Sequence, residues 1–111
     1  MPRVFVNYRS GDGEATAALI DQELSRLFGK KAIFRASKSI APGDNYRHGL
    51  LDAVRRSDLL LAVIGPRWLD AVDGHGRRRL DDPQDWVRRE IAEASAYRLR
   101  VIPVLVDSAT P

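Results

Sequence analysis

Trp86 and Glu90 are the residues whose types and spacing point most directly to chemistry. They lie four positions apart in a segment with a helical pattern, and residues four apart share one face of a helix. A flat aromatic surface beside a carboxylate suits a site for a planar, positively charged group attached to a sugar. From the spacing alone, the favoured interpretation is plainer: a half-buried tryptophan beside a solvated glutamate.

Four short apolar runs predict the strands that would position this pair. They are continuous rather than alternating, as in parallel strands covered on both faces, and they span residues 4–6, 32–34, 59–64 and 101–106. Between them, helical repeats place apolar residues on one face of each helix: Ala17, Ile20, Leu24, Leu27 and Phe28; then Tyr46, Leu50 and Val54; then Val87, Ile91, Ala94 and Ser95. Gly29 should end the first helix. Asp82 should cap the third helix, with Pro83 at its first position.

This alternation of strands and helices predicts the α/β class with a parallel sheet and right-handed crossovers. We expect a flavodoxin-like, three-layer fold with strand order 2-1-3-4 and helices on both faces. Pro103 favours an edge position for the last strand. No helix or fifth strand follows that strand, so we expect residues 1–111 to be one domain truncated from a longer protein. Ligands should bind at the carboxyl ends of the first and third strands.

The loops at that edge carry further polar groups. After the first strand, Arg9 and the backbone N–H groups at the next helix start form a plausible anion site, although an ordinary turn with a solvated arginine is the favoured interpretation. Gly11 and Gly13 lack the rest of a dinucleotide fingerprint. A long loop at 36–45 contains a Pro42-Gly43-Asp44 turn and is flanked by Arg35.

Composition excludes several classes of protein. The 111 residues are 44% hydrophobic and 30% charged, as in a single globular domain. With no cysteine there is no disulfide, thiolate metal site or cysteine nucleophile. His48 and His75 have no partner at metal-ligand spacing. We therefore expect no bound metal, and we expect both histidines to lie at the surface. No apolar run is long enough to span a membrane, and the cytoplasm is the expected location.

Two further classes of site are also disfavoured. The net charge of +3 depends largely on Arg77, Arg78 and Arg79. A short arginine run between glycines is usually a solvated loop, so we expect no nucleic-acid binding. No serine lies in an elbow-like turn with a credible base. A phospho-acceptor receiver would need an aspartate at the end of the third strand, where Ile64 and Gly65 stand instead.

Four segments, in the right order and spacing, together resemble a family. They are Val4-Phe-Val-Asn-Tyr-Arg-Ser10, Ser39-Ile-Ala-Pro-Gly-Asp44, Ser57-Asp-Leu-Leu-Leu-Ala-Val-Ile-Gly-Pro66 and Asp85-Trp-Val-Arg-Arg-Glu-Ile91. They resemble the first box, the BB loop, the third strand and the third helix of a bacterial Toll/interleukin-1 receptor (TIR) domain. The resemblance runs from Val4 to about Val106. Asn7 departs from the serine of many members, and the family's last strand and helix are absent.

The resemblance implies residue roles. The Trp-x-x-x-Glu pattern resembles that of the NAD-consuming members, so Glu90 is implied as the catalytic residue. The implied substrate-binding residues are Tyr8, Arg9, Ser10, Phe34, Arg35, Ile40 and Trp86. The implied self-association loop consists of Ser39, Ile40, Ala41, Pro42, Gly43 and Asp44. NAD⁺ would be a substrate rather than a cofactor.

The implied reaction is cleavage of the nicotinamide–ribose bond of NAD⁺. Nicotinamide leaves as a neutral molecule without protonation, so one carboxylate can suffice where ordinary glycosidases need two. Attack by water gives ADP-ribose, an internal attack gives a cyclic product, and the sequence is compatible with both. Self-association, triggered by a sensor domain elsewhere in the protein, would activate the enzyme in bacterial immune defence.

Two alternatives remain open at the level of sequence. The first is a non-catalytic TIR scaffold that recruits other TIR domains through the same loop. The second is an enzyme similar to nucleoside deoxyribosyltransferases, which share the α/β layout and a ribose-directed glutamate. The catalytic interpretation is favoured because adaptor TIR domains commonly lack a glutamate at the position of Glu90.

Overall fold

The strands and helices alternate along the chain as predicted. The computed structural model describes residues 2–35 and 46–106, apart from the side chains of 46–48. The elements are β1 (Val4–Asn7), α1 (Glu14–Phe28), β2 (Ile33–Arg35), α2 (Tyr46–Arg55), β3 (Leu59–Ile64), α3 (Trp86–Ala96) and β4 (Arg100–Leu105), with short 3₁₀ turns at Lys30–Ala32 and Arg79–Asp81. All strand pairs are parallel, in the order β2-β1-β3-β4. The predicted class and strand order are confirmed.

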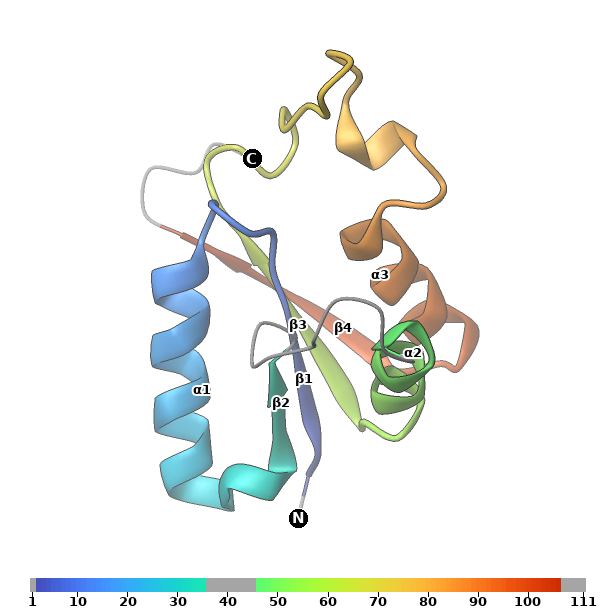
Figure 1. Ribbon diagram of the computed structural model, residues 1–111. Coiled ribbons are helices and arrows are strands. Elements are labelled where there is room, and N and C mark those ends of the chain that lie inside the picture. The colour runs from blue at the N-terminus through green and yellow to red at the C-terminus, as the bar shows by residue number, and fades with distance from the viewer. Residues whose placement is uncertain (1, 36–45, 107–111) are drawn as a thin grey trace.

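Helices cover the two faces of the sheet and complete three layers (Figure 1). Side chains alternate between the faces along a strand, so β1 contributes to two cores. Val4 and Val6 pack with Ala17 of α1, whereas Phe5 packs on the opposite face with Leu50 of α2. The first face is therefore covered by α1 and the second by α2 and α3.

The buried face of α1 differs from the prediction at two positions. Leu27 was expected inside and is 60% exposed, whereas Asp21 is only 3% exposed. At 100° per residue, Leu27 lies about 80° from Ala17 and Asp21 about 40° on the other side. Asp21 tolerates burial because its carboxylate accepts hydrogen bonds from Ser25 and Arg35. The helix ends at Gly29, as predicted, where φ is +94°.

The start of α3 was predicted three residues too early. Asp85, not Asp82, is the N-cap, and its side chain accepts a hydrogen bond from the backbone N–H of Arg88. Asp82 instead ends the preceding 3₁₀ turn, and its carbonyl accepts from the N–H of Asp85. Ser95, expected inside, is exposed, while Val87 and Ala94 are buried as predicted.

β4 forms one edge of the four-stranded sheet, as predicted from Pro103, because proline cannot donate a ladder hydrogen bond.

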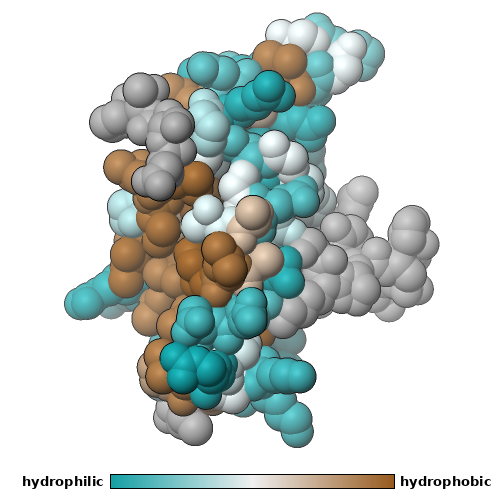
Figure 2. Space-filling model, turned by 90° about the vertical axis from the view of Figure 1, so that its left-hand side faces the viewer, coloured by the Kyte–Doolittle hydropathy of each residue, from teal (hydrophilic) through white to brown (hydrophobic). Residues whose placement is uncertain are grey.

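Figure 2 shows apolar side chains gathered on the side of the molecule that carries α1. The exposed large apolar residues of α1 and β4 are Leu19, Leu27, Ile102 and Leu105. Among the described helices, none is long and apolar enough to cross a membrane.

The centre of the sheet should dominate stability. Phe5 is fully buried between β2 and β3 and stacks on Phe34 with ring centroids 5.1 Å apart. We expect Phe5→Ala to lower the free energy of unfolding by about 3–5 kcal/mol, because it leaves a cavity in a close-packed core. Leu19→Ala, at a side chain 62% exposed, should change it by less than about 1 kcal/mol. Urea titration monitored by circular dichroism measures both, and equal losses would contradict this core assignment.

Candidate functional site

A pocket of about 880 Å³ opens at the carboxyl ends of β1 and β3, beside the start of α3. Its lining comes from four places: residues 8–12 after β1, Leu50 of α2, parts of the loop after β3 and the first turns of α3. Of the predicted site residues, Tyr8, Arg9, Ser10, Trp86 and Glu90 all line it. The structure therefore brings the two halves of the predicted site together at the predicted edge of the sheet.

Alternation along β1 directs polar side chains toward α3. Asn7 and Arg9 continue the face of Phe5, and both contact the start of α3. The Asn7 Nδ2 group donates a 2.8 Å hydrogen bond to Glu90 Oε1, and Arg9 pairs with Asp85. Two residues of strand span roughly 6.6 Å, and the five residues from Asp85 to Glu90 span about 7.5 Å of helix. The two spacings match, so both contacts form at once.

The pair between Arg9 and Asp85 is bidentate and buried. Its N–O distances are 2.9 and 3.0 Å, and each side chain is 7% exposed. The interpretation of Arg9 as a solvated residue in an ordinary turn is therefore wrong. Its charge is matched by Asp85, and the N–H of Gly11 donates to the Glu14 carboxylate. The predicted anion site is thus partly occupied by the protein's own carboxylates.

Asp12 ties the loop after β1 to the loop after β3. It is 5% exposed, and its Oδ1 accepts a 2.9 Å hydrogen bond from the backbone N–H of Arg67. The approach requires a glycine at position 65, because a Cβ there would lie 2.4 Å from Asp12 Oδ1. The two loops therefore form one wall of the pocket.

The side chain of Glu90 is buried. It is 4% exposed and lines the pocket. Burial raises its pKa from the ordinary value of 4.5 to about 7, opposed by the Asn7 hydrogen bond and assisted by the negative charge of Asp85. Near neutral pH the carboxyl therefore populates both protonation states, which a solvated glutamate does not. The plain interpretation of a solvated glutamate is wrong.

Trp86 is half-buried, as expected, and packs against the core beneath α2 and α3. The Arg89 guanidinium lies over its ring, 4.4 Å from the centroid. One face of the ring is therefore already covered by a planar cation of the protein itself. Trp68, in the loop after β3, is also half-buried, and its backbone N–H donates to the carbonyl oxygen of Gly65.

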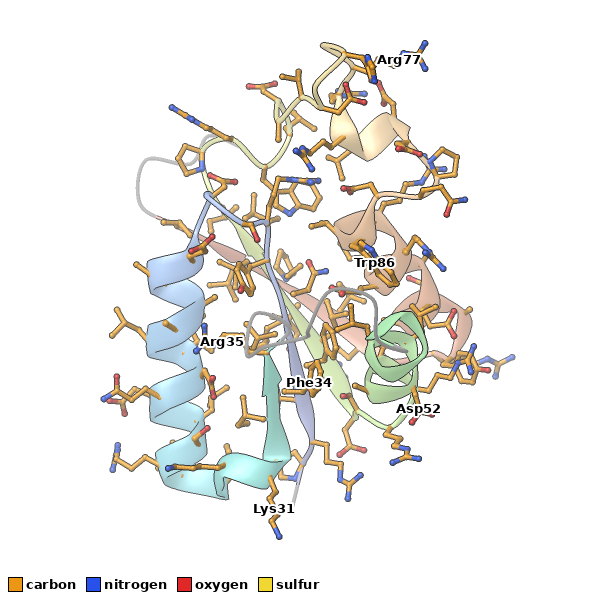
Figure 3. All side chains as sticks on the ribbon, viewed as in Figure 1. Lys31, Phe34, Arg35, Asp52, Arg77 and Trp86 are labelled. Carbon is orange, nitrogen blue, oxygen red and sulfur yellow. The ribbon has the colours of Figure 1, made fainter. Side chains whose placement is uncertain are left out.

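Other predicted site residues lie elsewhere. Phe34 and Arg35 project to opposite sides of β2 (Figure 3): Phe34 lines a smaller cavity of about 290 Å³, and Arg35 pairs with Asp21 at 2.8 Å. Ile40 and the loop residues Ser39, Ala41, Pro42, Gly43 and Asp44 fall outside the described residues. Their binding and assembly roles stay predictions.

Asn7, Asp12 and Asp85 were not among the predicted site residues. Asn7 had a detectable signal, because a polar residue directly after an apolar run stands at the end of a strand, where ligands bind. Asp85 and Asp12 depend on tertiary contacts that no local pattern encodes. His75 and the Arg77, Arg78 and Arg79 run are exposed. The described residues contain no cluster of three or more potential metal ligands.

The buried carboxyl of Glu90 should make stability depend on pH. A folded pKa above the unfolded value means that the ionised form is costly, so this contribution to stability falls as pH rises from 4.5 to about 7. We expect Glu90→Gln to stabilise the protein by about 3 kcal/mol above pH 7 and by less toward pH 5. Urea unfolding at several pH values, with the exposed Glu23→Gln as control, measures this difference. A stabilisation that is independent of pH would contradict the assignment.

The buried ion pair should respond differently from an exposed one. Asp85→Asn keeps a capping side chain but leaves the Arg9 guanidinium buried without its counter-charge. We expect a loss of about 3 kcal/mol in unfolding free energy. Asp81→Asn removes the same charge from the exposed pair with Arg78 and should change stability little. Equal effects in thermal unfolding would show that the pair is not buried in solution.

Comparison with known proteins finds relatives that match most of the chain. The sequence is 31% identical over 103 residues to a Drosophila melanogaster protein named NAD(+) hydrolase sarm1, covering 92% of this chain and 7% of that protein. The chain thus spans a small part of that relative. The fold is similar to the TIR domains of the activated Roq1 resistosome that recognises the effector XopQ, with a TM-score of 0.64 at 18% identity. That match covers 96% of this chain and 58% of the other.

The sequence model of the TIR domain family matches residues 4–111. This match includes the strand end that bears Asn7 and Arg9 and the helix that bears Trp86 and Glu90. The predicted resemblance is therefore confirmed at the level of family and fold. The chain belongs to the TIR domain family.

Proposed function

We propose that this TIR domain cleaves the nicotinamide–ribose bond of NAD⁺ and that Glu90 is the catalytic residue. The observation that carries the proposal is a desolvated carboxylate in the wall of a pocket large enough for a dinucleotide. The 31% identity to a protein named as an NAD(+) hydrolase supports the same activity. Bond cleavage needs charge stabilisation at the ribose, and a carboxylate shielded from water provides more of it than a solvated one.

The reaction proceeds through an oxocarbenium-like ribose. The bond between C1′ and the pyridinium nitrogen breaks, and its electron pair neutralises nicotinamide. Glu90 stabilises the positive charge that develops on the ribose and orients its hydroxyl groups. Water then attacks C1′ and loses a proton to give ADP-ribose, whereas an attack from within the same molecule gives a cyclic ADP-ribose.

The charges around the pocket fit a substrate with a cationic end. Six carboxylates line it against three arginines: Asp12, Asp70, Asp73, Asp82, Asp85 and Glu90, with Arg9, Arg67 and Arg79. The carboxylates nearest α3 attract the pyridinium ring, and Trp86 forms the adjacent wall. Tyr8 and Ser10 contact the ribose or pyrophosphate from the opposite loop. Arg9, held by Asp85, shapes this wall rather than supplying a free cation.

Activity depends on self-association in this proposal. The segment from Ser39 to Asp44 meets a neighbouring TIR domain, and Phe34, Arg35 and Ile40 contribute to the substrate site when that contact forms. The related Roq1 TIR domains occur in an assembled resistosome, which supports assembly as the trigger here. A sensor domain in a longer, bacterial and cytoplasmic protein would drive that assembly in immune defence.

The decisive test measures nicotinamide release. We expect protein held at high local concentration on a scaffold to release nicotinamide from NAD⁺, and both Glu90→Ala and Glu90→Gln to lose at least about 100-fold in kcat. Glu93→Gln is the matched control, because Glu93 lies on the same helix but pairs with Arg55.

Three outcomes would contradict the catalytic proposal. Equal rates in wild type and both Glu90 variants, or no release under forced assembly, would favour a non-catalytic scaffold that binds other TIR domains. Release of free base from deoxynucleosides but not from NAD⁺ would indicate a deoxyribosyltransferase-like enzyme.

A further inference from the structure

We propose that Asn7 is a positioning residue for Glu90: its amide fixes one carboxylate oxygen and leaves the other for the substrate. The inference deepens the proposed function and depends on it for its catalytic meaning. Among the described residues, Asn7 is the one that donates a hydrogen bond to this carboxylate, through Nδ2 to Oε1 at 2.8 Å. Glu90 lines the pocket, and in this proposal its second oxygen, Oε2, is the one that meets the substrate.

Glutamate needs such support because its side chain has three rotatable bonds. A carboxylate that stabilises a developing charge must be held within about 0.5 Å of its working position. The backbone of α3 alone cannot fix it, since several rotamers remain accessible on a helix. One strong hydrogen bond to an ionised group, of the kind that Asn7 makes, selects one of them.

Asn7 is itself held rigidly. It ends β1 in the middle of the sheet, where its neighbour in β3 is Ala62, and its side chain is fully buried. Nδ2 also lies 3.3 Å from the carbonyl oxygen of Val87. Both atoms that face Nδ2 are acceptors, so the amide must present its N–H₂ group rather than its oxygen. An aspartate at this position would oppose the carboxylate instead of supporting it.

The hydrogen bond from Asn7 also influences the pKa of Glu90. Burial raises the Glu90 pKa, and the Asn7 hydrogen bond is the interaction that lowers it. The other charged or titratable groups around the pocket lie on the loop after β1, on the loop after β3 and at the start of α3: Tyr8, Arg9, Asp12, Arg67, Asp70, Asp73, Arg79, Asp82 and Asp85. Asp85 adds a negative charge that acts in the direction of burial. Asn7 therefore counteracts both effects from the strand side.

The first experiment compares the wild-type chain with Glu90→Gln and needs no enzymatic activity. The sequence contains four glutamates and two asparagines, so carboxyl ¹³C and side-chain amide ¹⁵N signals can be assigned, with Glu90→Gln identifying the titrating pair. We expect the Asn7 amide signals to shift with pH with the same midpoint as the Glu90 carboxyl, near pH 7, and to lose this dependence in Glu90→Gln. An Asn7 signal that stays constant while Glu90 titrates would overturn the inference.

The second experiment removes the donor. Asn7→Ala should raise the Glu90 midpoint by about one pH unit, as expected for the loss of a hydrogen bond to a charged group, and Asn7→Asp should raise it further. Ser57→Ala is the matched control, because it also removes a buried hydrogen bond, from Ser57 to the carbonyl of Ala53. It should leave the midpoint unchanged. No change in Asn7→Ala would contradict the positioning role.

Activity then separates the two proposals. In an active protein, the pH at which kcat reaches half its maximum should move upward in Asn7→Ala together with the Glu90 midpoint. If the rate falls without that displacement, Asn7 acts only through stability. If wild-type protein releases no nicotinamide, the proposed function fails, while the carboxyl and amide titrations still decide whether Asn7 positions Glu90.

Discussion

The site depends on two buried polar contacts between the end of β1 and the start of α3. Asn7 reaches Glu90, and Arg9 reaches Asp85. Apolar packing brings α3 onto the sheet but does not choose its position along the strand, because the hydrophobic effect has no direction. Hydrogen bonds between buried groups do have direction, and an error of one residue would leave an unpaired charge. These contacts therefore fix the position of Glu90 along the direction of β1.

The fold buries the Glu90 carboxyl, which destabilises the domain when it is ionised, in the wall of the pocket where the proposed function would use it. Most of a folded chain avoids burying an ionised carboxylate, because desolvation disfavours its charged form. In this domain the cost falls at Glu90, on the same side of the sheet as the buried cluster that contains Phe5, Leu50 and Leu60. A raised pKa in a pocket is common at functional sites, and here its physical cause is burial together with Asp85.

The sequence predicted most of the architecture because its apolar runs match the strands. Residues 59–64 correspond to β3 without error, and the order of strands followed from the alternation with helices. Errors arose at polar residues whose positions depend on tertiary contacts. Asp21 took a place in the buried face of α1, and Asp85 replaced Asp82 as the cap of α3. Each was selected by a partner distant in sequence, Arg35 and Arg9 respectively, and periodicity carries no information about such partners.

The close approach of Gly65 to Asp12 has a mechanical consequence. Because no side chain fits between them and the Arg67 N–H is bound to the same carboxylate, the segments leaving β1 and β3 cannot hinge apart without losing a buried contact. Any adaptation to an incoming molecule must then come from the farther part of the connection, around Ala71 to Asp82, which has more exposed residues. One wall of the pocket would then stay fixed while the opposite wall adjusts to the molecule that enters.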